Sequence, residues 1–89
     1  MIVLIDKSFE KDVQIINDKK LLYSIADCIE DIQNLKKISE IPNCKKLKGG
    51  KKYYSIRIRQ YRIGFVYENH KIEFVRFLHR SKIYEHFPD

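Results

Sequence analysis

Hydrophobic and polar residues alternate along three consecutive runs between Tyr53 and Leu78, all rich in β-branched and aromatic residues. In the first run, apolar side chains occupy every second position from Tyr54 to Ile58, and Ser55 and Arg57 fall between them. The third run, from Ile72 onward, is apolar at nearly every position, which is typical of a strand covered on both faces. We therefore expect an antiparallel meander with one apolar face and with arginines gathered on the other.

Two helices are predicted upstream of this meander, after a short strand at Ile2 to Ile5. Ser8 is a candidate N-cap, and apolar residues then recur at helical spacing from Phe9 to Ile16. A second amphipathic pattern runs from Lys19 to Ile38, with Asp18 available as its N-cap. Because the break between the two patterns is so short, we expect an antiparallel helical hairpin that covers the apolar face of the sheet.

The remaining segments are a linker and a short tail. Ser39 to Lys52 contains the turn signal Pro42-Asn43, and Arg80 to Phe87 can form two helical turns with Ile83 and Phe87 facing inward. The sequence thus predicts a single α+β domain over residues 1–89. Its expected elements are an N-terminal strand, an antiparallel helical hairpin, a three-stranded antiparallel meander that completes a four-stranded sheet, and a short C-terminal helix.

Positive charge is concentrated in the second half of the chain. The net charge is +6 at pH 7, and 12 of the 18 Lys and Arg residues follow Asn43, whereas 8 of the 12 Asp and Glu residues precede it. A basic half with exposed aromatic rings points to a polyanion such as nucleic acid, although a surface that only keeps the protein soluble would explain the charge equally well. The residues expected to contact RNA are Lys45, Lys46, Lys48, Lys51, Lys52 and Arg59. The pair Gly49-Gly50 among these lysines favours a flexible loop over a P-loop, because no helix pattern follows it.

The cysteine pattern and the first residues point to the cytoplasm. Cys28 and Cys44 form no Cys-x-x-Cys pair, and we expect both to be reduced thiols. The apolar run from Met1 to Ile5 is too short for a signal or membrane-spanning segment. We therefore expect a cytoplasmic protein with no membrane association.

The residues with chemical potential favour a site without a metal or a cofactor. No metal-ligand spacing links the histidines, the carboxylates near the meander are few, and no serine or cysteine nucleophile motif is present. What remains is a set of guanidiniums, an imidazole and a phenol: Arg57, Arg62, His79, Arg80 and Tyr84. This set suits RNA cleavage by the 2′-OH, because arginines stabilise the charged phosphorane and histidine can transfer a proton. Equally, His79 can be a solvated strand-end residue and Tyr84 an ordinary core residue.

Three motifs give the chain a resemblance to the RelE/ParE superfamily of toxins from type II toxin–antitoxin systems. They are Lys46-Leu47-Lys48-Gly49, Tyr54-x-Ile56-Arg57-x-Arg59-x-Tyr61-Arg62-Ile63, and Phe77-Leu78-His79-Arg80-Ser81-Lys82-Ile83-Tyr84. The predicted order of elements is similar to the fold of that family over essentially the whole chain. The His-Arg-x-x-Ile-Tyr ending resembles RelE more than the gyrase inhibitor ParE.

The resemblance implies a ribosome-dependent endoribonuclease that cuts messenger RNA and is neutralised by an acidic, partly disordered antitoxin. By motif match, Arg62 would stabilise the transition state, Arg57 would be the basic residue on the preceding strand, and Tyr84 would stack on or orient the substrate. His79 or Arg80 would handle the proton. Where RelE has a pair of lysines on the first meander strand, this chain has Ser55 and Arg57, and an arginine does not act as a base.

Two other functions fit the same sequence: a non-catalytic ParE-type inhibitor of DNA gyrase, and an inactive module that binds RNA or an antitoxin. Codon preference and oligomeric state are open at this level.

Overall fold

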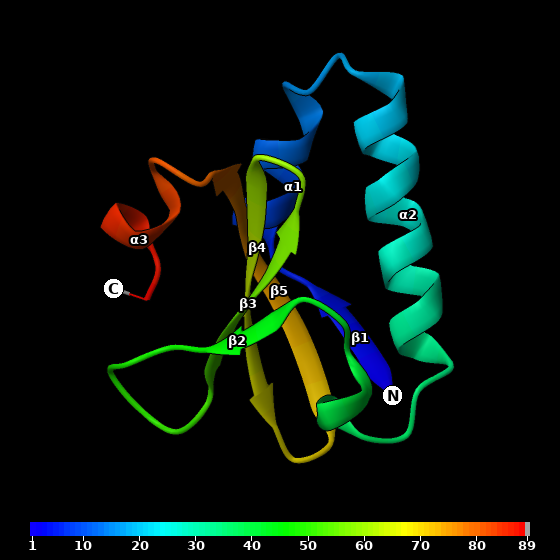
Figure 1. The fold of residues 1–89 in the computed structure, drawn as a ribbon, viewed down its shortest axis with the longest axis vertical. Coiled ribbons are helices and arrows are strands. Elements are labelled where there is room, and N and C mark those ends of the chain that lie inside the picture. The colour runs from blue at the N-terminus through cyan, green and yellow to red at the C-terminus, as the bar shows by residue number, and fades with distance from the viewer. Residues whose placement is uncertain (89) are drawn as a thin grey trace.

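The computed structural model describes residues 1–88 and has at its centre a five-stranded sheet with the strand order β1-β5-β4-β3-β2 (Figure 1). The strands are β1 Ile2–Ile5, β2 Cys44–Lys46, β3 Tyr53–Ile58, β4 Tyr61–Glu68 and β5 Lys71–His79. The helices are α1 Lys7–Gln14, α2 Lys19–Gln33, the 3₁₀ turn Ile38–Glu40 and α3 Ile83–His86. Strand β1 pairs with β5 in parallel, and the other neighbouring strands are antiparallel. The α+β class and the meander of β3, β4 and β5 are confirmed.

The predicted number of strands was wrong, because β2 lies within the segment expected to be a linker. This strand has three residues and pairs with β3, with Cys44 opposite Ile56 and Lys46 opposite Tyr54. A run of three residues with two adjacent lysines is too short to show the alternation of a strand. Its pairing partner, rather than its own composition, makes it a strand.

Helix boundaries differ from the sequence-based expectation at two ends. The N-cap of α1 is Asp6, whose carboxylate accepts a hydrogen bond of 2.9 Å from the backbone N–H of Ser8, the expected cap. Helix α2 begins at the predicted cap, Asp18, but it ends at Gln33 instead of Ile38. The side-chain amide of Asn34 donates to the carbonyl of Glu30, which closes the last turn. Apolar residues beyond this point kept the helical spacing without continuing the helix.

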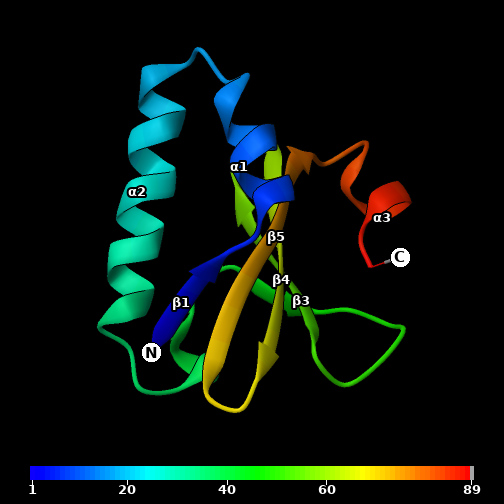
Figure 2. The ribbon, with the colours of Figure 1, turned by 180° about the vertical axis from the view of Figure 1, so that it is seen from behind.

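The main core lies between the sheet and the hairpin of α1 and α2. Figure 2 shows these two helices from behind. Phe9 of α1 packs its ring against Phe74 and Phe77 of β5, with ring centroids 5.4 and 6.1 Å apart. Ile25 and Ile32 of α2 are also buried in this core. One face of the sheet is therefore covered by the hairpin, as the alternation predicted.

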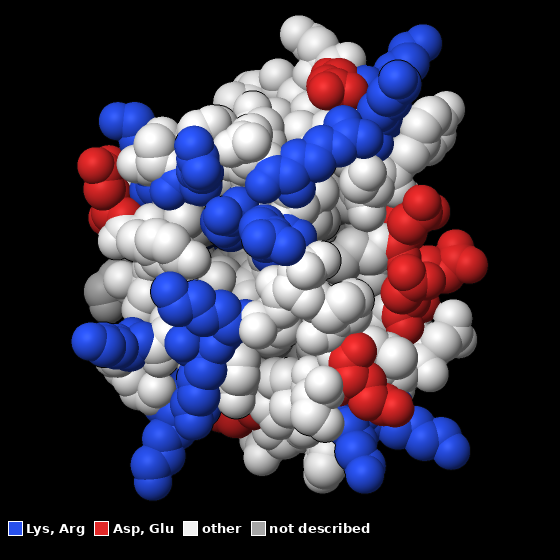
Figure 3. Space-filling model, in the orientation of Figure 1, with Lys and Arg blue, Asp and Glu red and all other residues white. Residues whose placement is uncertain are grey.

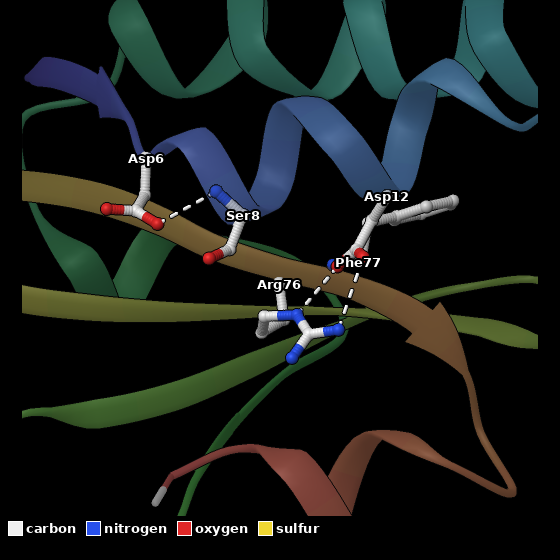
Figure 4. Close-up of polar contacts among 5 residues, drawn as sticks. All are labelled: Asp6, Ser8, Asp12, Arg76 and Phe77. Carbon is white, nitrogen blue, oxygen red and sulfur yellow. Dashed lines mark hydrogen bonds and ion pairs between the residues drawn. The ribbon is translucent and has the colours of Figure 1, made fainter.

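An ion pair fixes α1 to the middle of the sheet (Figure 4). The carboxylate of Asp12 accepts hydrogen bonds from Nε and Nη2 of Arg76 at 2.8 and 3.2 Å, and from the backbone N–H of Phe77 at 2.9 Å. The acidic side chain thus bridges a side chain and the backbone of β5. Hydrogen bonds of this charge-assisted kind are stronger than neutral ones.

The segment after β5 covers part of the opposite face of the sheet. Ile83 and Phe87 face inward, as predicted, and form a second apolar cluster with Leu47. Gly64 of β4 makes this docking possible, because a Cβ at this position would lie only 2.5 Å from the ring of Phe87. The segment after β5 is thus packed in a defined position against the strands.

Within residues 1–88, none of the helices is both long enough and apolar enough to cross a membrane.

Candidate active site

A cleft of about 670 Å³ lies where β2, β3 and β4 meet the segment that leads into α3. None of the described residues that line it carries a carboxylate. They are Asn43, Cys44, Lys45, Ser55, Arg57, Arg62, Arg80, Ser81 and Tyr84. The structure therefore brings together four of the five residues that the sequence predicted to be catalytic.

Two arginines face each other across the strands that form the floor of this cleft. Arg57 of β3 and Arg62 of β4 are directly paired in the register of the antiparallel ladder. Arg57 donates from Nη2 to the side-chain oxygen of Asn43 at 3.1 Å. Arg62 donates from Nη1 to the carbonyls of Arg59 and Tyr61, at 3.2 and 2.9 Å. Two like charges in opposite positions destabilise a sheet. An anion bound between the two guanidiniums would reduce their repulsion.

A third guanidinium comes from the turn after β5. The backbone N–H of Arg80 donates to the carbonyl of Gln60 at 2.8 Å, which ties this turn to the β3–β4 hairpin. The side chains of Arg80 and Ser81 both line the cleft. Cations from two segments far apart in the sequence therefore converge on one space.

Tyr84 of α3 forms one wall of the cleft. Its side chain is partly exposed, and its hydroxyl is hydrogen-bonded. Its hydroxyl forms a hydrogen bond of 3.1 Å with Oγ of Ser55, a residue that is itself buried. Tyr84 remains 49 % exposed, and the ammonium of Lys45 lies 5.8 Å from the centre of its ring. The ring is thus held at one end and open to a stacking partner on its surface.

His79 does not line the cleft. It follows Phe77 by two residues on β5, so it belongs to the helix-side face of the sheet. Its ring contacts Tyr61 edge-on at 5.6 Å. Its Nδ1 accepts a hydrogen bond of 3.1 Å from the backbone N–H of Ser81 and lies 2.9 Å from Oγ of the same serine. The imidazole therefore touches the site through Ser81.

The six residues expected to bind RNA have different places. Lys45 lines the cleft, and Lys46 and Lys48 join it in lining a second groove of about 350 Å³ beside Tyr84. Lys51 and Lys52 are exposed in the loop before β3, and Lys52 lies 3.5 Å from Glu68.

The sixth of these residues lies away from the cleft. Arg59 does not line it, and its guanidinium is 3.9 Å from the carboxylate of Asp18.

The surface charge is divided between the two sides of the molecule. In Figure 3, seen as in Figure 1, Lys and Arg spread over the centre and left, and the largest group of Asp and Glu lies at the right edge, where α2 lies, while smaller groups of both signs lie elsewhere on this face. The basic residues on this face reflect the concentration of Lys and Arg in the second half of the chain. A polyanion approaching this face would be attracted to the side of the cleft.

Residues 1–88 contain no group of three or more His, Cys, Asp or Glu side chains arranged to hold a metal ion. One lining residue is a thiol, but burial raises the pKa of Cys44 to about 11. The thiol therefore stays protonated at neutral pH and is a poor nucleophile.

Sequence reasoning did not assign to the site four of the residues that line the cleft, Asn43, Cys44, Ser55 and Ser81. It also did not foresee the hydrogen bond between Ser55 and Tyr84. Asn43 has a positive φ of 57°, which is a conformation that asparagine tolerates better than most residues. The Pro42-Asn43 signal located this turn, but only the fold shows that it orients Arg57.

Comparison with known proteins gives one consistent result. Residues 3–84 match the family model described as the ParE toxin of the type II toxin–antitoxin system parDE. Over 89 residues, 99 % of this chain and 100 % of the relative, the chain is 38 % identical to toxin RelE3 of Methanocaldococcus jannaschii.

Solved structures show the same fold. The toxin in the RelB–RelE antitoxin–toxin complex from Methanococcus jannaschii superposes with a TM-score of 0.80 at 36 % identity, over 96 % of this chain and 99 % of that one. The YoeB dimer from Staphylococcus aureus superposes with a TM-score of 0.70 at 20 % identity, over 89 % and 95 % of the two chains. The second likeness concerns the fold alone.

Proposed function

Because the chain belongs to the RelE/ParE superfamily, the toxins of type II toxin–antitoxin systems, we propose that it is an endoribonuclease toxin that cuts messenger RNA on the ribosome. One observation carries the proposal: Arg57, Arg62 and Arg80 converge with Tyr84 on one cleft that no carboxylate lines. Such a cleft suits a phosphodiester, whose negative charge increases as the transition state forms. The relative named toxin RelE3 and the toxin of the RelB–RelE complex support a role as a toxin of the RelE kind.

In the proposed reaction, the ribose 2′-oxygen forms a bond to the adjacent phosphorus, and the bond from phosphorus to the 5′-oxygen breaks. The products are a 2′,3′-cyclic phosphate and a 5′-hydroxyl. Arg57, Arg62 and Arg80 hold the non-bridging oxygens of the phosphorane, and the ring of Tyr84 stacks on a neighbouring base. No divalent ion is needed, because the guanidiniums supply the charge that a metal would otherwise provide.

Two proton transfers accompany these bond changes. A guanidinium keeps its proton, so the three arginines act as charge stabilisers only. The hydroxyls of Ser55, Ser81 and Tyr84 can both donate and accept, and two of them are already hydrogen-bonded to each other. We assign to these hydroxyls the relay that takes the 2′-proton and returns one to the leaving 5′-oxygen. His79 acts on this relay from outside the cleft, through Ser81.

We further propose that an acidic, partly disordered antitoxin neutralises the toxin by folding onto the cationic face. The opposite charges of two such partners would speed their association and set its orientation. The RelB–RelE structure is an antitoxin–toxin complex, which supports an antitoxin as the partner.

The proposal is tested in a reconstituted translation system by mapping cleavage sites on a messenger RNA and analysing the product ends. The wild type should cut translated RNA and leave 2′,3′-cyclic phosphates, and a 2′-deoxy substitution at the cut site should abolish cleavage. Arg62→Ala should remain folded and lose cleavage by roughly 10²-fold or more, as expected for the loss of a group that stabilises the transition state. Lys11→Ala, a change to an exposed lysine of α1, is the matched control and should keep full activity.

An inactive wild type, or products with 5′-phosphate ends, would refute the proposal, because the second result would make water the nucleophile. The family model is described by ParE, so gyrase inhibition is the second candidate. A supercoiling assay separates the two: inhibition of gyrase without RNA cleavage would establish it.

A further inference from the structure

Another cleft, of about 350 Å³, lies between α2 and β3 and adjoins the active cleft. The two spaces share Asn43 and Arg57 in their lining. We call this one the α2 cleft, because Asp27 and Asp31 of that helix form one of its walls. Its apolar lining includes isoleucines of α2 and β3 that are almost fully buried. It therefore combines a polar wall with a flat apolar surface, directly beside the arginines of the active cleft.

The two sides of the α2 cleft carry charges of opposite sign. Within residues 1–88, the carboxylates of Asp27 and Asp31 take part in no hydrogen bond and no ion pair. The side of β3 carries Arg57 and Arg59. Arg59, which does not line the active cleft, thus lines this one, and its guanidinium is 3.9 Å from the carboxylate of Asp18. The cleft offers hydrogen-bond acceptors on one wall and donors on the other, which suits a ligand that carries both.

Among the four RNA bases, guanine matches this arrangement. An ionised carboxylate only accepts hydrogen bonds, through two oxygens, and guanine presents two adjacent donors, N1–H and the N2 amino group, on its Watson–Crick edge. Its O6 and N7 form the acceptor pair that a guanidinium binds in bidentate fashion. Adenine and cytosine each present one amino group beside an acceptor nitrogen. Uracil presents a single N–H between two carbonyl oxygens, which a carboxylate repels.

We propose that the α2 cleft binds a guanine base of single-stranded RNA whose phosphate lies at Arg57. The inference rests on the proposed function and extends it from the reacting phosphate to the recognition of one base. Asp27 and Asp31 accept from N1–H and the N2 amino group, and Arg59 donates to O6 and N7. The volume of the cleft is at the lower end of the roughly 300–1,000 Å³ range of small-ligand sites, which is suitable for one base.

The site is tested by fluorescence anisotropy with labelled pentanucleotides that carry 2′-fluoro sugars and therefore cannot be cleaved by their own 2′-oxygens. Two uridines flank a central guanosine, inosine, adenosine or uridine on each side, and EDTA removes any divalent ion that could bridge a carboxylate and a phosphate. The wild type should bind the guanosine pentamer more tightly than the uridine pentamer by roughly 5- to 100-fold. Inosine lacks only the N2 amino group and should lose most of this gain.

The variant Asp27→Asn/Asp31→Asn should still bind the uridine pentamer, and its ratio of guanosine to uridine affinity should fall to about one. The matched control is Glu10→Gln/Glu30→Gln, which neutralises two exposed carboxylates outside the α2 cleft, one of them on the same helix. Both variants gain the same net charge, so a general rise in RNA affinity is common to both. The control should keep the preference of the wild type for guanosine.

The outcomes separate the site from the proposed function. Equal binding of all four pentamers, equal gains from guanosine and inosine, or a guanosine preference that survives in Asp27→Asn/Asp31→Asn would overturn the guanine site alone. Free GDP that binds as tightly as the guanosine pentamer would make a nucleotide, and not RNA, the ligand of the α2 cleft, and would also overturn the assignment. If no pentamer binds to the wild type, both the guanine site and the proposed function are refuted.

Discussion

Arg57 and Arg62 occupy opposing positions on β3 and β4, where like charges oppose folding. Each guanidinium is partly satisfied by neutral oxygen acceptors, from Asn43 for the first and from two backbone carbonyls for the second. These acceptors orient the side chains without neutralising them. A cationic pair kept in this way is ready to hold an anion at the point where both guanidiniums face the cleft.

His79 provides the first prediction at the scale of single residues. Because Nδ1 accepts from the backbone N–H of Ser81, His79→Asn can place its amide oxygen on the same N–H, two residues further on, as asparagine does in turns. We expect His79→Asn to retain most of the cleavage rate, and His79→Phe, which lacks an acceptor, to lose it by roughly tenfold or more.

Single-turnover cleavage on ribosomes measures this effect, and near-UV circular dichroism verifies that both variants are folded. If His79→Asn is as inactive as His79→Phe, the imidazole itself transfers the proton, and its role through Ser81 is wrong.

The two-residue alternation of a strand determined for which residues the face of the sheet could be predicted from the sequence. Alternation from Tyr54 to Ile58 was sufficient to place Arg57 on the face away from the core. The same period assigns His79 to the face of Phe77, opposite to the cleft. By contrast, Tyr84 reaches Ser55 only because the chain turns back after β5, and no local pattern encodes that return.

At the scale of elements, the position of α1 depends on one acidic side chain. Asp12 accepts three hydrogen bonds from β5, and its side chain is only 12 % exposed. Removal of one partner of such a group leaves the others poorly satisfied. The helix has eight residues, which is too short to be stable in water without tertiary contacts.

We predict that Asp12→Ala lowers the free energy of unfolding by about 2–4 kcal/mol. Urea denaturation measures this change, and Lys11→Ala, on the same helix but exposed, should change stability by no more than about 0.5 kcal/mol. A loss for Asp12→Ala as small as that of the control would mean that apolar packing by Phe9 is sufficient to hold α1.

The elements with long or strongly periodic patterns were those that the sequence could predict. The helical hairpin and the three long strands follow from local spacing and from the cap at Asp18. Strand β2 could not be predicted because its three residues gain strand geometry only by pairing with β3. The end of α2 was misplaced because residues 34–38 still supply apolar side chains to the core after the helix has ended.

At the scale of the whole molecule, the face seen in Figure 3 carries most of its Lys and Arg at the centre and left and its largest acidic group along the edge where α2 lies. Within the described residues, the cleft itself has no acidic lining that could screen its three guanidiniums. A partner that neutralises the protein must therefore supply the missing negative charge.

We expect the product of an adjacent reading frame to be a small acidic protein that binds this face. Hydrogen exchange of the complex should show protection of β3, β4 and the segment from Arg80 to Phe87, and the affinity should decrease as salt is raised. The variant Arg57→Glu/Arg62→Glu should bind at least tenfold more weakly, whereas Lys11→Glu/Lys71→Glu should bind nearly as the wild type does. Protection limited to α2, or an affinity insensitive to salt, would contradict this arrangement.

The docking of Phe87 over Gly64 also determines when the site becomes complete during synthesis of the chain. Translation delivers β3 and β4 first and the tail last, so the cationic strands leave the ribosome before Tyr84 can reach Ser55. Until then the cleft lacks its third guanidinium and one wall. We therefore expect the proposed site to be incomplete for as long as the residues after β5 remain in the exit tunnel, and a nascent chain stalled at that point should not cleave RNA.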